Sequence, residues 1–157
     1  MESQLNILSE SLDQKIKVLE EIQQYNQKQE QAFKNGEADI AGFDEAVEEK
    51  DRLIEKLMRL DDGFETMYAK LAEELKANQA QHAMKIKVLQ EKIAKVTEMG
   101  VTIQAQEARN KKLVEDYFAK ARAGVRQNRQ SSKAAYDYYK SMSGAIIRQS
   151  SFMDSKQ

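Results

Sequence analysis

Cysteine, proline and tryptophan are absent from this sequence of 157 residues, and glycine occurs only six times. A chain without cysteine can form neither a disulfide nor a thiolate metal site, and it has no cysteine nucleophile. Because proline and glycine are the residues that most often interrupt helices, their scarcity favours long helices. The lack of disulfides fits a reducing compartment, so we expect the protein to be cytoplasmic.

Long hydrophobic runs are also missing. No stretch approaches the roughly 20 apolar residues that cross a bilayer. The first residues, MESQLNILSESLDQK, are acidic and polar where a secretory signal has a basic start followed by an unbroken apolar run. We therefore expect neither a secretory leader nor insertion into a membrane.

Glutamate, lysine, glutamine, alanine and leucine dominate the sequence, a composition typical of long helices. We predict an all-α fold, an antiparallel three-helix bundle or coiled coil with a long third helix and a partly disordered or short-helical C-terminal tail. Residues 1–130 are expected to form the helical bundle. Residues 131–157 are expected to form a basic tail rich in apolar and aromatic residues.

In the first part of the chain, apolar residues recur every three or four positions, which places them on one face of a helix. They are Leu5, Leu8, Leu12, Ile16, Leu19 and Ile22, and the helix is expected to reach Phe33. Asn35 and Gly36 readily adopt the left-handed conformation that closes a helix, which predicts a turn near 35–43. Asp39 or Asp44 is expected to cap the next helix.

A second apolar stripe follows this turn. Its members are Val47, Leu53, Leu57, Leu60, Phe64, Met67, Leu71 and Leu75. Between Leu75 and Met84 there is no large aliphatic residue, so we place a second reversal of the chain in this stretch. The alternative is a helix that continues through it, because alanine and glutamine are tolerated in helices.

The third stripe follows a seven-residue repeat, as in coiled coils. Its apolar members are Ile86, Leu89, Ile93, Val96, Ile103, Leu113, Val114 and Tyr117. Gly100, Glu107 and Asn110 occupy positions of the same repeat but are unsuited to a core. We favour a third helix of up to about 50 residues that outruns a first helix of about 30, so that these three residues meet water. Alternatively, they are buried and fix register or partner choice.

Catalytic and metal-binding groups are few. The single histidine, His82, has no second histidine or cysteine with which to share a metal, so we expect it on the surface or in a turn. A di-iron bundle needs Glu-x-x-His pairs on two helices, which one histidine cannot provide. We expect no enzymatic activity, no metal and no other cofactor.

Charge is divided along the chain. Residues 1–108 hold 14 basic and 22 acidic residues, a net charge of −8, whereas residues 109–157 hold 11 and 4, a net charge of +7. The split predicts a basic arm that meets an acidic or phosphate-bearing partner or folds back on the acidic body, unless it is only the solvated face of a helix. Acidic residues interrupt the basic run, so we do not expect nucleic acid binding.

The chain ends in AAYDYYKSMSGAIIRQSSFMDSKQ, where aromatic and aliphatic residues follow no sustained helical or strand period. Such residues cannot bury themselves on one helix face, so we expect a tail that is disordered or loosely packed until a partner covers it. The alternative is a short helix packed on the bundle. Its buried face would consist of Tyr136, Tyr139, Met142 and Ile146.

Three stretches together resemble the FlgN-type flagellar export chaperones. They are FKNGEADIAGFDEAVEEKDRLIEKLMRLDDGF (Phe33–Phe64), IQAQEARNKKL (Ile103–Leu113) and the tail YYKSMSGAIIRQSSFMDSKQ. The combination of Gly36, the acidic turn and the Tyr-Tyr…Phe-Met-Asp ending is more specific than any single stretch. The FliT-type chaperones share the architecture, and a structural coiled-coil scaffold that pairs with a second copy of the chain is the alternative function.

The resemblance implies a cytoplasmic protein that binds the C-terminal helices of hook–filament junction proteins, prevents their early assembly and delivers them to the flagellar export gate. A homodimer is also compatible with the pattern. Phe118 lies beside Tyr117 and widens the apolar face beyond what one partner helix needs. We therefore predict that the client-binding residues are Leu113, Val114, Tyr117 and Phe118. The tail residues predicted to bind the export gate or another partner are Tyr136, Tyr138, Tyr139, Ile146 and Phe152.

Overall fold

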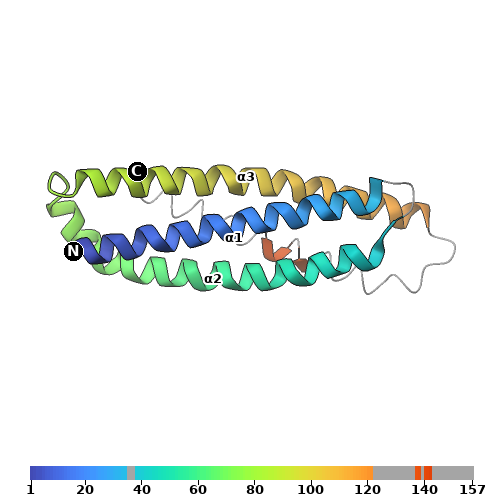
Figure 1. Ribbon diagram of the computed structural model, residues 1–157, viewed down its shortest axis with the longest axis horizontal. Coiled ribbons are helices and arrows are strands. Elements are labelled where there is room, and N and C mark those ends of the chain that lie inside the picture. Colours follow the sequence, from blue (N-terminus) through green and yellow to red (C-terminus); the bar gives the residue numbers. More distant parts are fainter. Residues whose placement is uncertain (35–37, 122–136, 139, 143–157) are drawn as a thin grey trace.

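Three long helices make up most of the protein (Figure 1). The computed structural model describes residues 1–34, 38–121, 137–138 and 140–142. The helices are α1 (Glu2–Lys34), α2 (Ile40–Ala77) and α3 (Ala83–Lys120). The described residues from 137 to 142 are also helical, and we call them the C-terminal turn. The all-α bundle expected from the sequence is confirmed.

The three helices of the bundle do not all pack against one another. α1 lies between α2 and α3 and packs against both (Figure 1), whereas no Cα atoms of α2 and α3 lie within 8 Å of each other. The side chains of Asn6 and Lys85 meet near one end of α1 and α3, and those of Asn26 and Gln106 meet further along. α1 and α3 therefore run parallel, with α2 antiparallel to both.

The first reversal is closed by a helix cap at Asp39. The Asp39 Oδ1 atom accepts a hydrogen bond from the backbone N–H of Gly42 at 2.9 Å, which satisfies one of the donors left free at the start of α2. A β-carbon at Gly42 would collide with the Asp39 carboxylate, so a larger residue there would disturb the cap. Of the two caps expected from the sequence, Asp39 is the one used.

The second reversal lies where the apolar stripe is interrupted. α2 ends at Ala77, residues 78–82 form turns, and α3 begins at Ala83. This confirms the reversal and rules out the continuous helix. His82 lies in the turn, as expected, but its side chain is 8% exposed and so is buried rather than on the surface.

Apolar residues of all three helices form one continuous core. The residues that α1 contributes are Leu5, Leu8, Leu12, Val18, Leu19 and Ile22. Ile16, which we assigned to this face, is half-buried and packs against the core, and its neighbour Lys15 is buried. The Lys15 ammonium is 2.5 Å from the Asp61 carboxylate of α2, and this pairing makes the burial of a lysine possible.

The prediction that Glu107 and Asn110 meet water was wrong. Only 6% of Glu107 and 2% of Asn110 is exposed, and Gly100 is half-buried. The third helix has 38 residues, equal to α2 and close to the 33 of α1, so its partners extend alongside both residues. The alternative interpretation, that these polar residues are buried at their seven-residue positions, describes the structure.

The C-terminal turn packs on the bundle. Tyr138 and Met142 are each 2% exposed, in agreement with the alternative of a short packed helix, although Tyr138 was not on the face that we assigned. Tyr136, Tyr139 and Ile146 lie outside the described residues, as does the boundary expected at 130 and 131. No helix within the described ranges combines the length and apolar character needed to cross a membrane.

Candidate functional site

Four aromatic residues gather where the C-terminal ends of α1 and α3 meet the start of α2. They are Phe33, Phe43, Tyr117 and Phe118, and we call them the aromatic end. The Phe33 ring lies 5.3 Å from Phe43 and 5.6 Å from Tyr117, measured between centroids. Tyr117 and Phe118 are 5.4 Å apart with their rings nearly perpendicular. The Phe33–Phe43 and Tyr117–Phe118 pairs have the edge-to-face geometry that aromatic rings favour, and the Phe33 and Tyr117 rings are tilted by 60°.

The aromatic end contains two of the predicted client-binding residues. Tyr117 and Phe118 are half-buried, as is Leu113, so each offers part of its side chain to the surface. Val114 is 7% exposed and belongs to the core. Sequence reasoning missed Phe33 and Phe43. Both residues could have been found from the sequence, because they lie on either side of the first turn. In a bundle whose helices run up, down and up, this turn lies beside the end of the third helix.

Polar side chains occupy core positions next to the aromatic end. We call them the polar cluster, and they are Asn26, Gln29, Lys50, Glu107 and Asn110. The Lys50 ammonium donates to Asn26 Oδ1 at 2.6 Å, to Glu107 Oε1 at 2.9 Å and to Gln29 Oε1. Asn110 donates to the backbone carbonyl of Asn26 at 3.0 Å. The cluster ties all three helices together at one level of the bundle.

Tyr138 of the C-terminal turn completes this cluster. Its hydroxyl donates a hydrogen bond to Glu107 Oε1, and the Lys50 ammonium lies 3.7 Å from the centroid of its ring. A cation at this position is attracted to the face of the ring. Tyr138 is thus buried where the tail was expected to offer it to a partner. The other predicted tail residues, Tyr136, Tyr139, Ile146 and Phe152, lie outside the described residues.

Burial dominates the electrostatics of the cluster. It lowers the pKa of Lys50 from 10.5 to about 8, although the nearby Glu107 carboxylate opposes this change. Burial also raises the pKa of Glu107, against the opposing effects of Lys50 and the Tyr138 hydroxyl. The second carboxylate oxygen, Glu107 Oε2, is buried and accepts no hydrogen bond from any residue that the structure describes. The charges of Lys50 and Glu107 are therefore kept at a cost in desolvation free energy, and Glu107 Oε2 has no donor among the described residues.

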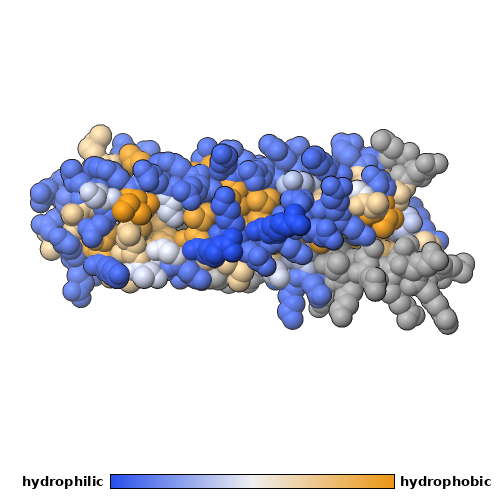
Figure 2. All heavy atoms as spheres, turned by 60° about the horizontal axis from the view of Figure 1, so that its bottom comes forward, coloured by the Kyte–Doolittle hydropathy of each residue, from blue (hydrophilic) through white to orange (hydrophobic). Residues whose placement is uncertain are grey.

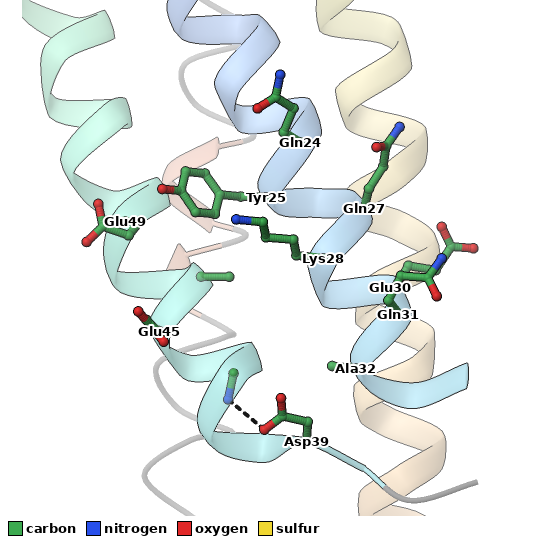
Figure 3. Close-up of a pocket in the computed structure, with 12 residues that line it drawn as sticks. Gln24, Tyr25, Gln27, Lys28, Glu30, Gln31, Ala32, Asp39, Glu45 and Glu49 are labelled. Atoms are coloured by element: carbon green, nitrogen blue, oxygen red, sulfur yellow. Dashed lines mark hydrogen bonds between the residues drawn. The ribbon is translucent and has the colours of Figure 1, made fainter. Parts of the chain in front are cut away.

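A broad hollow of about 1130 Å³ lies between the second half of α1 and the first turns of α2 (Figure 3). Tyr25 and Lys28 extend from α1 towards Glu45 and Glu49 of α2, and the Lys28 ammonium lies 5.0 Å from the centroid of the Tyr25 ring. Most of the residues around the hollow are charged or amides. This lining is suited to water and ions rather than to an apolar helix.

Apolar surface is present elsewhere on the bundle. Figure 2 shows a discontinuous band of hydrophobic residues along the long axis, bordered by hydrophilic side chains. Several large hydrophobic residues are individually exposed, and they are Ile7, Met58, Met84, Val88 and Val101. This apolar surface is suited to packing against another helix.

Within the described chain, no three histidine, cysteine, aspartate or glutamate residues are grouped so that they could hold a metal ion.

Comparison with known proteins gives one family. The family model described as FlgN protein matches residues 1–143 of the chain, which include all three helices and the C-terminal turn. Neither the curated proteins nor the solved structures provide a match.

Proposed function

Since this chain belongs to the FlgN family of flagellar export chaperones, we propose that its clients are the hook–filament junction proteins and that it binds their C-terminal helices. It acts in the cytoplasm, keeps these segments from assembling early and delivers them to the export gate. The observation that carries the proposal is the match of the family across 143 residues of the chain, supported by a helical bundle with a partly exposed aromatic end.

The proposed client site consists of Leu113, Val114, Tyr117 and Phe118, together with Phe33 of the same aromatic end. A client helix with an apolar face would dock beside α3 as one more helix of the bundle. Half-buried aromatic rings suit this role, because large aromatic side chains supply much of the binding energy of an interface and lose little conformational entropy. Phe43 is buried and packs against the Phe33 ring, and Val114 is buried in the core.

Contact with the export gate is assigned to the C-terminal tail, as the family resemblance implies. Of its tyrosines the structure describes Tyr138, which packs on the polar cluster. A gate contact by Tyr138 would therefore require this residue to leave its position between Lys50 and Glu107.

Calorimetric titration tests the proposed clients. The full chain is titrated with the C-terminal fragment of each junction protein encoded by the same genome. We expect saturable binding of at least one fragment. If neither fragment binds and light scattering shows a concentration-dependent mass, the client proposal fails and a coiled-coil scaffold becomes the better account.

A further inference from the structure

The C-terminal turn fills a place that the three long helices leave open. α2 and α3 both pack on α1 but do not approach each other within 8 Å between Cα atoms, and Tyr138 lies between Lys50 of α2 and Glu107 of α3. Figure 1 shows the turn (red) beside α2. The turn therefore packs as a short fourth helix against the side of the bundle between α2 and α3. We call this side the α2–α3 face and define it by Lys50 and Glu107.

Among the described residues of the turn, two side chains make this contact. Tyr138 and Met142, four residues apart and so on one helical face, are both 2% exposed. Asp137, Lys140 and Ser141 are exposed. By contrast, α1, α2 and α3 bury nine, ten and eight residues, respectively. The described residues of the turn contribute two buried side chains, and a longer amphipathic helix can replace this contact.

The face also carries a specific chemical requirement. Glu107 is 6% exposed and needs hydrogen-bond donors, of which the Tyr138 hydroxyl is one, while its Oε2 atom has none among the described residues. The buried Lys50 ammonium favours an aromatic ring above it. A phenol meets both needs with a single side chain, whereas phenylalanine meets one and leucine neither. The unsatisfied oxygen can accept a further donor from an incoming helix.

We propose that the α2–α3 face around Lys50 and Glu107 is a docking site for an amphipathic client helix that carries a tyrosine and, four residues later, a bulky apolar residue. In the free protein, Tyr138 and Met142 occupy this site and compete with the client. The proposal rests on the proposed function in one respect, since the client is taken to supply the helix. It adds to that function a second docking surface, separate from the aromatic end, together with a partner preference and an intramolecular competitor.

The test uses full-length variants in which the competitor is removed. The variant Tyr138→Ala with Met142→Ala empties the face, and Asp137→Ala with Ser141→Ala is the matched control, with the same spacing on the exposed side of the turn. We expect the first variant to bind the junction-protein fragment at least about tenfold more tightly than wild type. The control should bind like wild type. Equal affinity of wild type and the emptied variant would overturn the competition.

A second arm does not depend on the client. A labelled peptide with the sequence of residues 134–146, AAYDYYKSMSGAI, is titrated into each chain and followed by fluorescence anisotropy. It should bind the emptied variant more tightly than wild type, and the peptide with alanine at the positions of Tyr138 and Met142 should lose this binding. Equal binding of the two peptides, or no preference for the emptied variant, would overturn the docking site.

The two arms separate the two proposals. If no chain binds a junction-protein fragment, the proposed function fails, and the peptide titration still decides whether the face is a docking site. Circular dichroism shows whether the emptied variant is folded. If it is not, Tyr138→Phe takes its place in both arms, because it keeps the ring over Lys50 and removes only the hydroxyl, so a smaller increase in affinity is expected. Unchanged affinity in this variant would then contradict the requirement for a phenol.

Discussion

Tyr138 donates a hydrogen bond from its hydroxyl to Glu107, a residue 31 positions earlier in the chain, and this contact attaches the C-terminal turn to the polar cluster. Both side chains are buried, and the Lys50 ammonium lies between them and α1, where it reaches Asn26 and Gln29. Folding of the bundle and docking of the turn are therefore linked through a single buried carboxylate.

Removing the hydroxyl of Tyr138 tests this link. Tyr138→Phe keeps the ring in place but takes a donor from a buried carboxylate, so we expect the free energy of unfolding to fall by about 1–3 kcal/mol. Chemical denaturation followed by circular dichroism measures the change. Ser141→Ala, an exposed position of the same turn, serves as the control. If both variants have wild-type stability, the hydrogen bond contributes nothing to the fold.

The buried pair of Lys50 and Glu107 should show strong coupling. Lys50→Met leaves Glu107 charged and without its cation, and such a loss typically costs about 3–5 kcal/mol. Lys50→Met combined with Glu107→Gln removes both charges, so we expect the double variant to be more stable than the lysine variant alone. Lys56→Met, an exposed lysine of the same helix, should be nearly neutral. A double variant that is no more stable than Lys50→Met in the denaturation experiment would contradict the pairing.

Stability should depend on pH through Lys50. Its pKa is about 8 in the folded protein and 10.5 in an unfolded chain, so between these values the unfolded state binds more protons. The contribution of Lys50 to the free energy of unfolding therefore rises as pH rises from about 8 to about 10.5, by about 3 kcal/mol. Below pH 8 the full cost of burying the charge is present. The difference in stability between wild type and Lys50→Met isolates this change, and a constant difference over the range would refute it.

Two valines of α3 differ in burial. Val114 is 7% exposed and Val101 is 62% exposed on the same helix. Val114→Glu would bury a charge without a partner, so we expect a loss of about 2–3 kcal/mol or more in unfolding free energy. Val101→Glu should change stability little. Thermal melts of the two variants compare them directly, and similar melting temperatures would mean that Val114 is not part of the core.

The helices and both reversals could be predicted because their signals are local. Apolar periodicity, the Asp39 cap and the gap in large aliphatic residues before Met84 each depend on a few neighbouring positions. The burial of Glu107 could not be predicted in this way. It depends on Lys50 and Asn26, which lie on two other helices, and a lysine in a sequence is normally taken as exposed.

The site was predictable only in part for the same reason. Tyr117 and Phe118 stand out because two adjacent aromatic residues widen one face of a helix, and the structure places both at the aromatic end. Their contact with Phe33 depends on how the helices align, which the periodicity of one helix does not specify. Tyr138 belongs to a stretch without a sustained period, and its burial follows from the polar side chains that it meets.

The most direct test of the central claim, client binding at the aromatic end, is calorimetry on Tyr117→Ala with Phe118→Ala, titrated with the junction-protein fragment that binds wild type. We expect this variant to stay folded and to lose at least about tenfold in affinity, or about 1.4 kcal/mol. Val101→Ala, which shortens an exposed apolar residue of the same helix, should bind like wild type. Wild-type affinity in the folded double variant would contradict the claim.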